Sequence, residues 1–177
     1  MDNPLMGISF EDFSDMLLEA FTRNIRLQNE FINALFGEFN RELFSNELQD
    51  ITLEILDNSE MIDITLDSDG YYEDPELSEE DLEEVYYLGY FDGDTRHIYI
   101  NRGLFGNGDV NELLLVAETL LHEMVHGYLF QQGHGADYKH GELFQREAIR
   151  RGLVDNHITE PATTVFYKWW FTTRGQE

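Results

Sequence analysis

Residues 110–132, VNELLLVAETLLHEMVHGYLFQQ, form the most informative segment of the chain. Asp109, followed by Glu112 three residues later, is typical of a helix start, and Gly133 is typical of a helix stop. One helix is therefore expected over residues 110–132. Apolar side chains lie almost all the way round this helix, as in a buried central helix. The exception is a narrow polar stripe that contains Thr119, His122, Glu123 and His126.

The polar stripe predicts a metal site. Buried imidazoles and carboxylates cost free energy unless they find partners. His122 and His126 lie one helical turn apart, so their ring nitrogens can bind one metal ion at about 2.0–2.1 Å. Glu123 lies at the edge of the same face, which suits a base that contacts a metal-activated water better than a third ligand. The HExxH pattern also occurs by chance, but its place in an apolar helix favours the metal site.

A catalytic zinc usually has three protein ligands and one water, so the third ligand must come from outside the helix. Metzincin spacing is excluded, because Leu129 and Gln132 occupy the positions of its glycine and its third histidine. His134 follows the helix stop directly and has little chain with which to turn back. His140 follows a loop of residues 133–139 that is long enough to return, so we expect His140 to be the third ligand.

A glutamate on a later helix is the alternative third ligand. A second helix is expected over residues 142–151, where the apolar spacing resumes, and it carries Glu142 and Glu147. The remaining candidates, His97 and His157, stand alone on predicted strands or loops. We assign them no role in the site.

The composition narrows the function classes. The chain of 177 residues has no cysteine, which excludes disulfides, a thiol nucleophile and thiolate zinc sites. Any zinc must therefore be held by histidines and carboxylates. The N-terminus lacks a secretory signal pattern, and no uncharged apolar run approaches the roughly 18 residues of a membrane helix. We expect a soluble, cytoplasmic protein of one domain with terminal additions.

The formal net charge of −25 is concentrated in the first half of the chain. Residues 1–95 hold 26 of the 36 acids and only 3 of the 11 bases, and residues 67–84 form an acidic insertion without any base. Nucleic-acid affinity comes largely from cations that neutralise phosphates, so weak or no direct DNA binding is expected. The acidic surface favours solubility, and a docking surface for a basic protein partner is the alternative.

The first third of the chain is expected to be helical and then extended. Apolar residues at helical spacing predict one or two helices over residues 10–44, with Gly37 as a possible break. Alternating β-branched residues then predict a strand over residues 51–57, with residues 61–67 as the second arm of a hairpin.

Two further β-prone segments follow. Residues 86–91 and 96–101 flank a turn signal at residues 92–94 and predict a hairpin, in which Ile98 and Ile100 share one face. The strand at residues 98–100 is a candidate edge for pairing with an extended substrate. The aromatic segment VFYKWWF, residues 165–171, predicts a final strand or a cap over the core.

Four segments together resemble the SprT-like, or Spartan-like, family of zincin metalloproteases: residues 39–44 (FNRELF), 87–100, 118–130 and 140–144 (HGELF). The resemblance implies an α+β fold in which a small mixed sheet packs on the central HExxH helix. It also implies one zinc ion per chain, held by His122, His126 and His140, with Glu123 as the catalytic base. The resemblance divides the chain into an N-terminal helical extension (1–35), a protease domain (36–164) and an aromatic C-terminal tail (165–177).

By this resemblance the chain is a metalloendopeptidase that hydrolyses peptide bonds with a zinc-activated water, and proteins associated with DNA are among its expected substrates. Many relatives carry a DNA-binding cysteine ribbon that this chain lacks. Arg146, Arg150 and Arg151 are the candidates for a local basic patch, although a solvated helix face is the more ordinary interpretation. A non-catalytic, acidic zinc-binding interaction protein or a DNA mimic is the alternative function.

Overall fold

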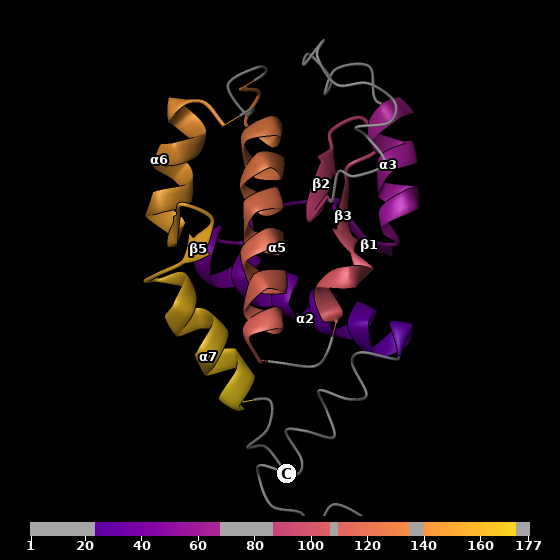
Figure 1. The fold of residues 1–177 in the computed structure, drawn as a ribbon. Coiled ribbons are helices and arrows are strands. Elements are labelled where there is room, and N and C mark those ends of the chain that lie inside the picture. The colour runs from indigo at the N-terminus through magenta and orange to yellow at the C-terminus, as the bar shows by residue number, and fades with distance from the viewer. Residues whose placement is uncertain (1–23, 68–86, 107–109, 135–139, 173–177) are drawn as a thin grey trace, which may run out of the picture.

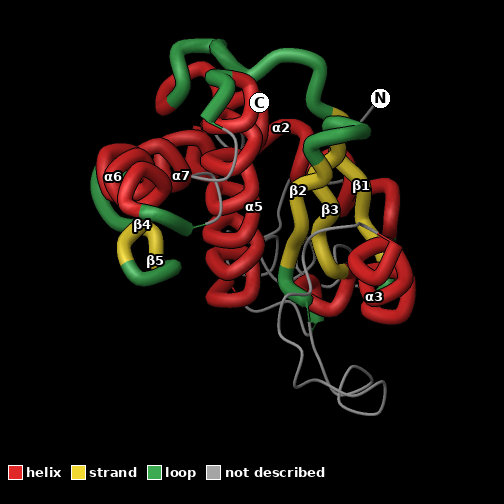
Figure 2. Tube along the Cα trace, turned by 90° about the horizontal axis from the view of Figure 1, so that it is seen from above, coloured by secondary structure: helices red, strands yellow, loops and turns green. Residues whose placement is uncertain are grey.

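The computed structural model describes residues 24–67, 87–106, 110–134 and 140–172. Helix α5 (Val110–Gln131) stands in the centre of the fold (Figure 1). Helices α6 (Glu142–Arg151) and α7 (Ala162–Thr172) lie on one side of α5, and a three-stranded sheet lies on the other. Helix α3 (Asn58–Asp67) covers the far face of the sheet, as the view from above also shows (Figure 2). The fold is therefore α+β, as expected from the sequence.

The sheet has the strand order β1-β3-β2. Strand β1 (Thr52–Leu56) pairs in parallel with β3 (His97–Asn101), and β2 (Gly89–Asp92) pairs with β3 as an antiparallel hairpin. The hairpin prediction is confirmed. The prediction of β3 as an edge strand is wrong, because β1 and β2 occupy both of its edges. The strand whose edge faces α5 is β2, which contacts that helix.

The sheet separates two apolar clusters, as the alternation in β3 predicts. Ile98 and Ile100 are fully buried in the main core together with α5 and α2 (Ile25–Leu43). Tyr99 points to the opposite face, where it packs with Leu56 of β1 and Met61 of α3.

Residues 61–67 form part of α3, so their prediction as a strand is wrong. One half of a capping box marks the helix start, because the backbone N–H of Asp57 donates to Glu60 Oε2 at 2.8 Å. The first helical hydrogen bond follows, in which Met61 N–H donates to the carbonyl of Asp57 at 2.9 Å. Met61 and Ile64, three residues apart, pack against the same small cluster. Capping and a helical contact spacing therefore outweigh the β-branched composition of this segment.

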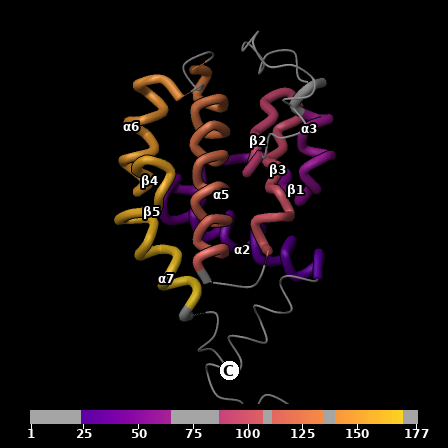
Figure 3. The backbone as a smooth tube through the Cα atoms, viewed as in Figure 1, coloured from indigo at the N-terminus to yellow at the C-terminus, as the bar shows by residue number. Residues whose placement is uncertain are grey.

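Helix α2 extends without a break through Gly37, so no helix boundary lies there. Its cap is Asn24, whose side chain accepts hydrogen bonds from the backbone N–H groups of Arg26 and Leu27. Residues 10–23 of the predicted helical segment lie outside the described residues, as do the acidic residues 68–84. Figure 3 shows α2 passing behind α5 toward α7, which it contacts.

The aromatic segment at residues 165–171 belongs to helix α7, so its prediction as a strand is wrong and its prediction as a cap over the core is confirmed. Phe166 is fully buried and Trp170 nearly so, and both belong to the main core. Phe31 of α2 makes edge-to-face contacts with Trp169 and Trp170 at centroid distances of 5.4 and 6.2 Å. Burial of rings at helical spacing against α2 decides the conformation over their β propensity.

Helix α5 extends over the predicted range and contributes most of its length to the core. Within the described ranges it is the one helix that is long and apolar enough to cross a membrane by length and composition, and most of it is buried inside the protein. Helices α2 and α6, strands β2 to β5 and the short 3-10 helix η1 (Arg102–Phe105) all contact it. The apolar composition of α5 is therefore explained by its place in the core.

The last turn of α6 is anchored by a buried arginine. The guanidinium of Arg151 lies between the rings of Phe44 and Tyr128, at 4.4 and 4.2 Å from their centroids, and it donates to Glu147 Oε2 at 2.6 Å. Burial raises the pKa of the Glu147 carboxyl, but the hydrogen bond and charge of Arg151 outweigh it and lower the pKa below its ordinary value. The predicted basic patch therefore loses Arg151 to the core, while Arg146 and Arg150 stay exposed.

Replacing Arg151 should destabilise the domain strongly. Arg151→Ala removes the partner of a buried carboxylate together with the stacking contacts, and we expect a loss of about 3 kcal/mol in the free energy of unfolding. Arg150→Ala, on the exposed face of the same helix, should cost less than about 0.5 kcal/mol. Urea denaturation at pH 7 measures both values. Equal midpoints for the two variants would show that the stacked arginine does not anchor α6.

Candidate metal centre

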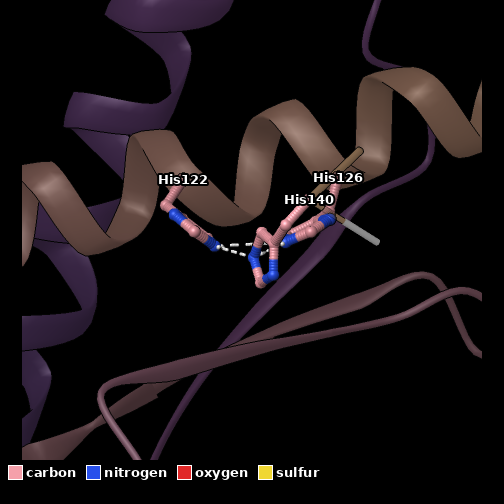
Figure 4. Close-up of side chains that lie close together, drawn as sticks. All are labelled: His122, His126 and His140. Atoms are coloured by element: carbon pink, nitrogen blue, oxygen red, sulfur yellow. Dashed lines mark hydrogen bonds between the residues drawn. The ribbon is translucent and has the colours of Figure 1, made fainter. Parts of the chain in front are cut away.

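Three histidines from two parts of the chain meet beside α5. His122 and His126 extend from one face of α5, and His140 lies just before α6 (Figure 4). The Nε2 atoms of the three rings are separated by 2.8 Å (His122 and His140), 3.0 Å (His126 and His140) and 3.1 Å (His122 and His126). Within the described ranges they form the group of side chains that could hold a metal ion.

This triangle of nitrogens cannot be satisfied by hydrogen bonds alone. Each Nε2 atom is either a donor or an acceptor, so at least one of the three contacts must join two donors or two acceptors. A cation that accepts all three lone pairs removes the conflict. On either side of the plane through the three nitrogens there is a point about 2.0–2.1 Å from each of them. This is the usual distance between zinc and an imidazole nitrogen. The donor set therefore fits a metal ion such as zinc.

Phe144, in the first turn of α6, supports all three imidazoles. Its ring centroid lies 4.9 Å from that of His122, 4.4 Å from that of His126 and 4.8 Å from that of His140. His140 adopts a left-handed backbone conformation with φ of 59°, which histidine tolerates better than most residues, and Gly141 begins α6 directly after it. The third ligand is thus held by the start of α6.

The environment keeps the rings of His122 and His140 neutral. Burial, together with the nearby His140, lowers the pKa of His122 to about 4, although the hydrogen bond with Asn156 acts in the opposite direction. His140 is the most exposed ring of the three, yet burial lowers its pKa as well. Because a metal binds the unprotonated imidazole nitrogen, these rings are available as ligands at neutral pH.

A small hairpin in contact with α5 orients His122. Strands β4 (Leu153–Val154) and β5 (His157–Ile158) are joined by a turn in which Asp155 and Asn156 both have positive φ. The Oδ1 atom of Asn156 lies 3.1 Å from Nδ1 of His122. When Nδ1 carries the proton and donates it to Asn156, the lone pair of Nε2 faces the other two histidines.

Glu123 lies between α5 and the edge of β2. It is 6 % exposed, burial raises its carboxyl pKa to about 8, and a hydrogen bond from the backbone N–H of Phe91 partly offsets this rise. Gly89 allows the close approach, because a Cβ atom there would lie 2.6 Å from Thr119 Cγ2 and 3.2 Å from Glu123 Oε1. The carboxyl is therefore held beside the histidines and is not one of the three converging ligands.

Two cavities adjoin His122 and His140. One, of about 220 Å³, is also lined by Glu123 and reaches Gly89 at the start of β2. The other, of about 210 Å³, extends from His122 and His140 between α6 and the β4–β5 turn. Asn156 lines both of them. The candidate metal centre thus adjoins open space next to two of its three histidines.

The structure distinguishes among the candidates that the sequence offered. It brings together His122, His126 and His140, whereas His134 and Glu142 are exposed outside the cluster and Glu147 is occupied by Arg151. His97 stacks on Tyr99, and His157 contacts Glu118. Asn156 and Gly89 also belong to the site, although no sequence pattern identifies them. The Asp155–Asn156 pair is a recognisable turn signal, but nothing in the sequence places that turn beside His122.

No protein-family model, curated protein or solved structure matches the chain. The site itself offers three imidazole nitrogens, one carboxyl of raised pKa and two adjoining cavities. Imidazole ligands suit zinc, copper, iron and nickel, and three protein ligands leave a further coordination position for water or substrate.

Metal content should depend on His140 and not on His134. Elemental analysis of protein purified without chelator should find about one zinc per chain, because three neutral imidazoles provide a complete protein ligand set. His140→Ala should lower this occupancy sharply, whereas His134→Ala, a change of the same type six residues earlier, should not. Loss of zinc in His134→Ala with full occupancy in His140→Ala would contradict the assignment.

Asn156 should affect metal affinity through His122. Asn156→Gly suits the positive φ at this position but removes the acceptor of the Nδ1 proton, and we expect zinc affinity to fall about 10- to 100-fold. Asn156→Asp keeps an acceptor oxygen and is the matched control. Competition with a chromophoric chelator measures both affinities. Equal affinity in the wild type and Asn156→Gly would show that the contact does not orient the ring.

Proposed function

We propose that the chain is a zinc-dependent endopeptidase of SprT-like type with a zincin-like core. The observation that carries the proposal is that the Glu123 carboxyl lines the same cavity as His122 and His140. A zinc ion held by the three histidines would supply Lewis acidity toward a carbonyl and would lower the pKa of water. The HExxH spacing on α5 and the HGELF segment that contains His140 support the same assignment.

Glu123 is suited to move a proton during peptide hydrolysis. Its carboxyl is kept out of bulk water, and its pKa of about 8 lies near neutrality, where a group both accepts and releases a proton readily. The Phe91 N–H and the tight contact with Gly89 fix its position. In this proposal Glu123 takes the proton of the attacking water and passes it to the leaving amine.

The edge of β2 is suited to align an extended polypeptide. The carbonyl of Leu88 accepts the N–H of Asn101 on β3. Because backbone groups alternate in an antiparallel pair, those of Gly89 then face away from β3, toward the cavity that contains Glu123. An added strand at this edge would be recognised mainly through its main chain, which favours unfolded substrates.

The arrangement of Glu123 also weighs against a purely structural metal site. Structural zinc sites usually have four protein ligands, whereas three ligands converge here in the described part of the chain. A buried carboxyl that binds no metal costs free energy and has no use in a non-catalytic zinc protein. Catalysis gives a reason for its place beside the histidines.

Glu123→Gln should abolish proteolysis while the zinc content and the fold stay intact. The amide has the size of the carboxyl but cannot accept the proton, and positioned acid–base groups contribute about 10²- to 10⁴-fold in rate. Turnover of an unfolded protein substrate by the zinc-loaded chain measures the loss. Glu54→Gln is the matched control, since it makes the same change at an exposed position of β1 that lines neither cavity.

Two outcomes would contradict the proposal in different ways. Unchanged turnover in Glu123→Gln would remove this residue from the reaction. A zinc-loaded wild type that cleaves none of a broad set of unfolded, basic and DNA-binding proteins would favour the non-catalytic alternative.

A further inference from the structure

The cavity between α6 and the β4–β5 turn has an apolar wall and a polar rim. Phe144, Ala148 and Leu153 are at most 3 % exposed and supply the wall. Gln145 and Asp155 are exposed and supply part of the rim. The cavity begins at His122 and His140, so a group that enters it lies next to the candidate metal centre.

Asp155 places one carboxylate at this rim. It occupies the β4–β5 turn with φ of 50°, and no basic side chain forms an ion pair with it within residues 24–67, 87–106, 110–134 and 140–172. Apart from the histidines, it is the one ionisable side chain among the described residues that line this cavity. An apolar wall with an anionic rim fits a side chain that has an aliphatic stem and a cationic end.

The other cavity beside the histidines is lined by Glu118 and so has the same sign of charge. No lysine or arginine of the described residues lines either cavity. The formal net charge of −25 adds a long-range attraction for cationic chains and a repulsion of acidic ones. The local and the global charges therefore favour the same class of substrate.

We propose that Asp155 makes the cavity between α6 and the β4–β5 turn a pocket for a lysine or arginine side chain of the substrate, close to the bond that is cleaved. The inference rests on the proposed peptidase function and adds a substrate class to it. The aliphatic stem packs against Phe144 and Leu153, and the cationic end reaches Asp155. Asp155 is thus a specificity residue, which contacts the substrate and takes no part in bond cleavage.

A peptide series tests the pocket. The zinc-loaded protein is incubated with sets of three unstructured peptides that have lysine, norleucine or glutamate at one position and are otherwise identical. That position is moved in turn through each residue around the cleaved bond. At one position lysine should be preferred over norleucine about three- to fivefold in kcat/KM, as for a partly exposed ion pair, and glutamate should be the poorest. The ratio of kcat/KM for the lysine peptide to that for the norleucine peptide should fall to about one in Asp155→Asn and Asp155→Gly. Both replacements suit a positive φ.

The control is Asp63→Asn on α3, which removes one charge on the far face of the sheet. Asp63→Asn should keep the lysine preference, because it changes the net charge by the same amount as Asp155→Asn but leaves the pocket unaltered. Cleavage without a lysine preference, or equal loss in Asp63→Asn and Asp155→Asn, would overturn the pocket and leave the peptidase function standing. Absence of cleavage in every peptide and in unfolded proteins would overturn both.

Discussion

Three imidazole nitrogens are held within about 3 Å of one another, and much of the fold serves to bring them together. Two of the rings are fixed by α5, but His140 belongs to a separate segment and must be brought to them. Helix α6 does this by contacts at both of its ends. Phe144 packs against the three rings in its first turn, and Arg151 inserts between Phe44 and Tyr128 in its last. A stacked arginine far from the histidines thereby helps to hold the third of them in place.

The polar stripe of α5 also requires the sheet to approach closely. Two glycines make this possible, one on each surface. A Cβ at Gly89 of β2 would collide with Thr119, and a Cβ at Gly127 of α5 would lie 3.3 Å from the ring of Phe91. With both side chains absent, the edge of β2 lies near enough for the Phe91 N–H to reach the Glu123 carboxyl. The two glycines thus allow the Phe91 N–H to donate to the buried Glu123 carboxyl.

Sequence patterns predicted the elements that are decided locally. The central helix, the β2–β3 hairpin and α6 each have their own caps, turns and apolar spacing, and the HExxH motif identified two converging histidines. The β-branched alternation of residues 61–67 predicts a strand, but the local hydrogen bond from Asp57 N–H to Glu60 starts a helix there. The strand order and the contact of Asn156 with His122 could not be predicted, since both depend on how distant segments meet.

The distribution of charge explains why a resemblance to DNA-associated proteases does not by itself imply nucleic-acid binding. Every arginine in the described part of the chain forms an ion pair with an acid, including the exposed Arg26, Arg146 and Arg150. Affinity for DNA grows with the number of phosphates that cations neutralise. Cations already paired within a protein of net charge −25 must give up those partners to contribute. The same electrostatics that weaken contact with a polyanion strengthen contact with a basic polypeptide.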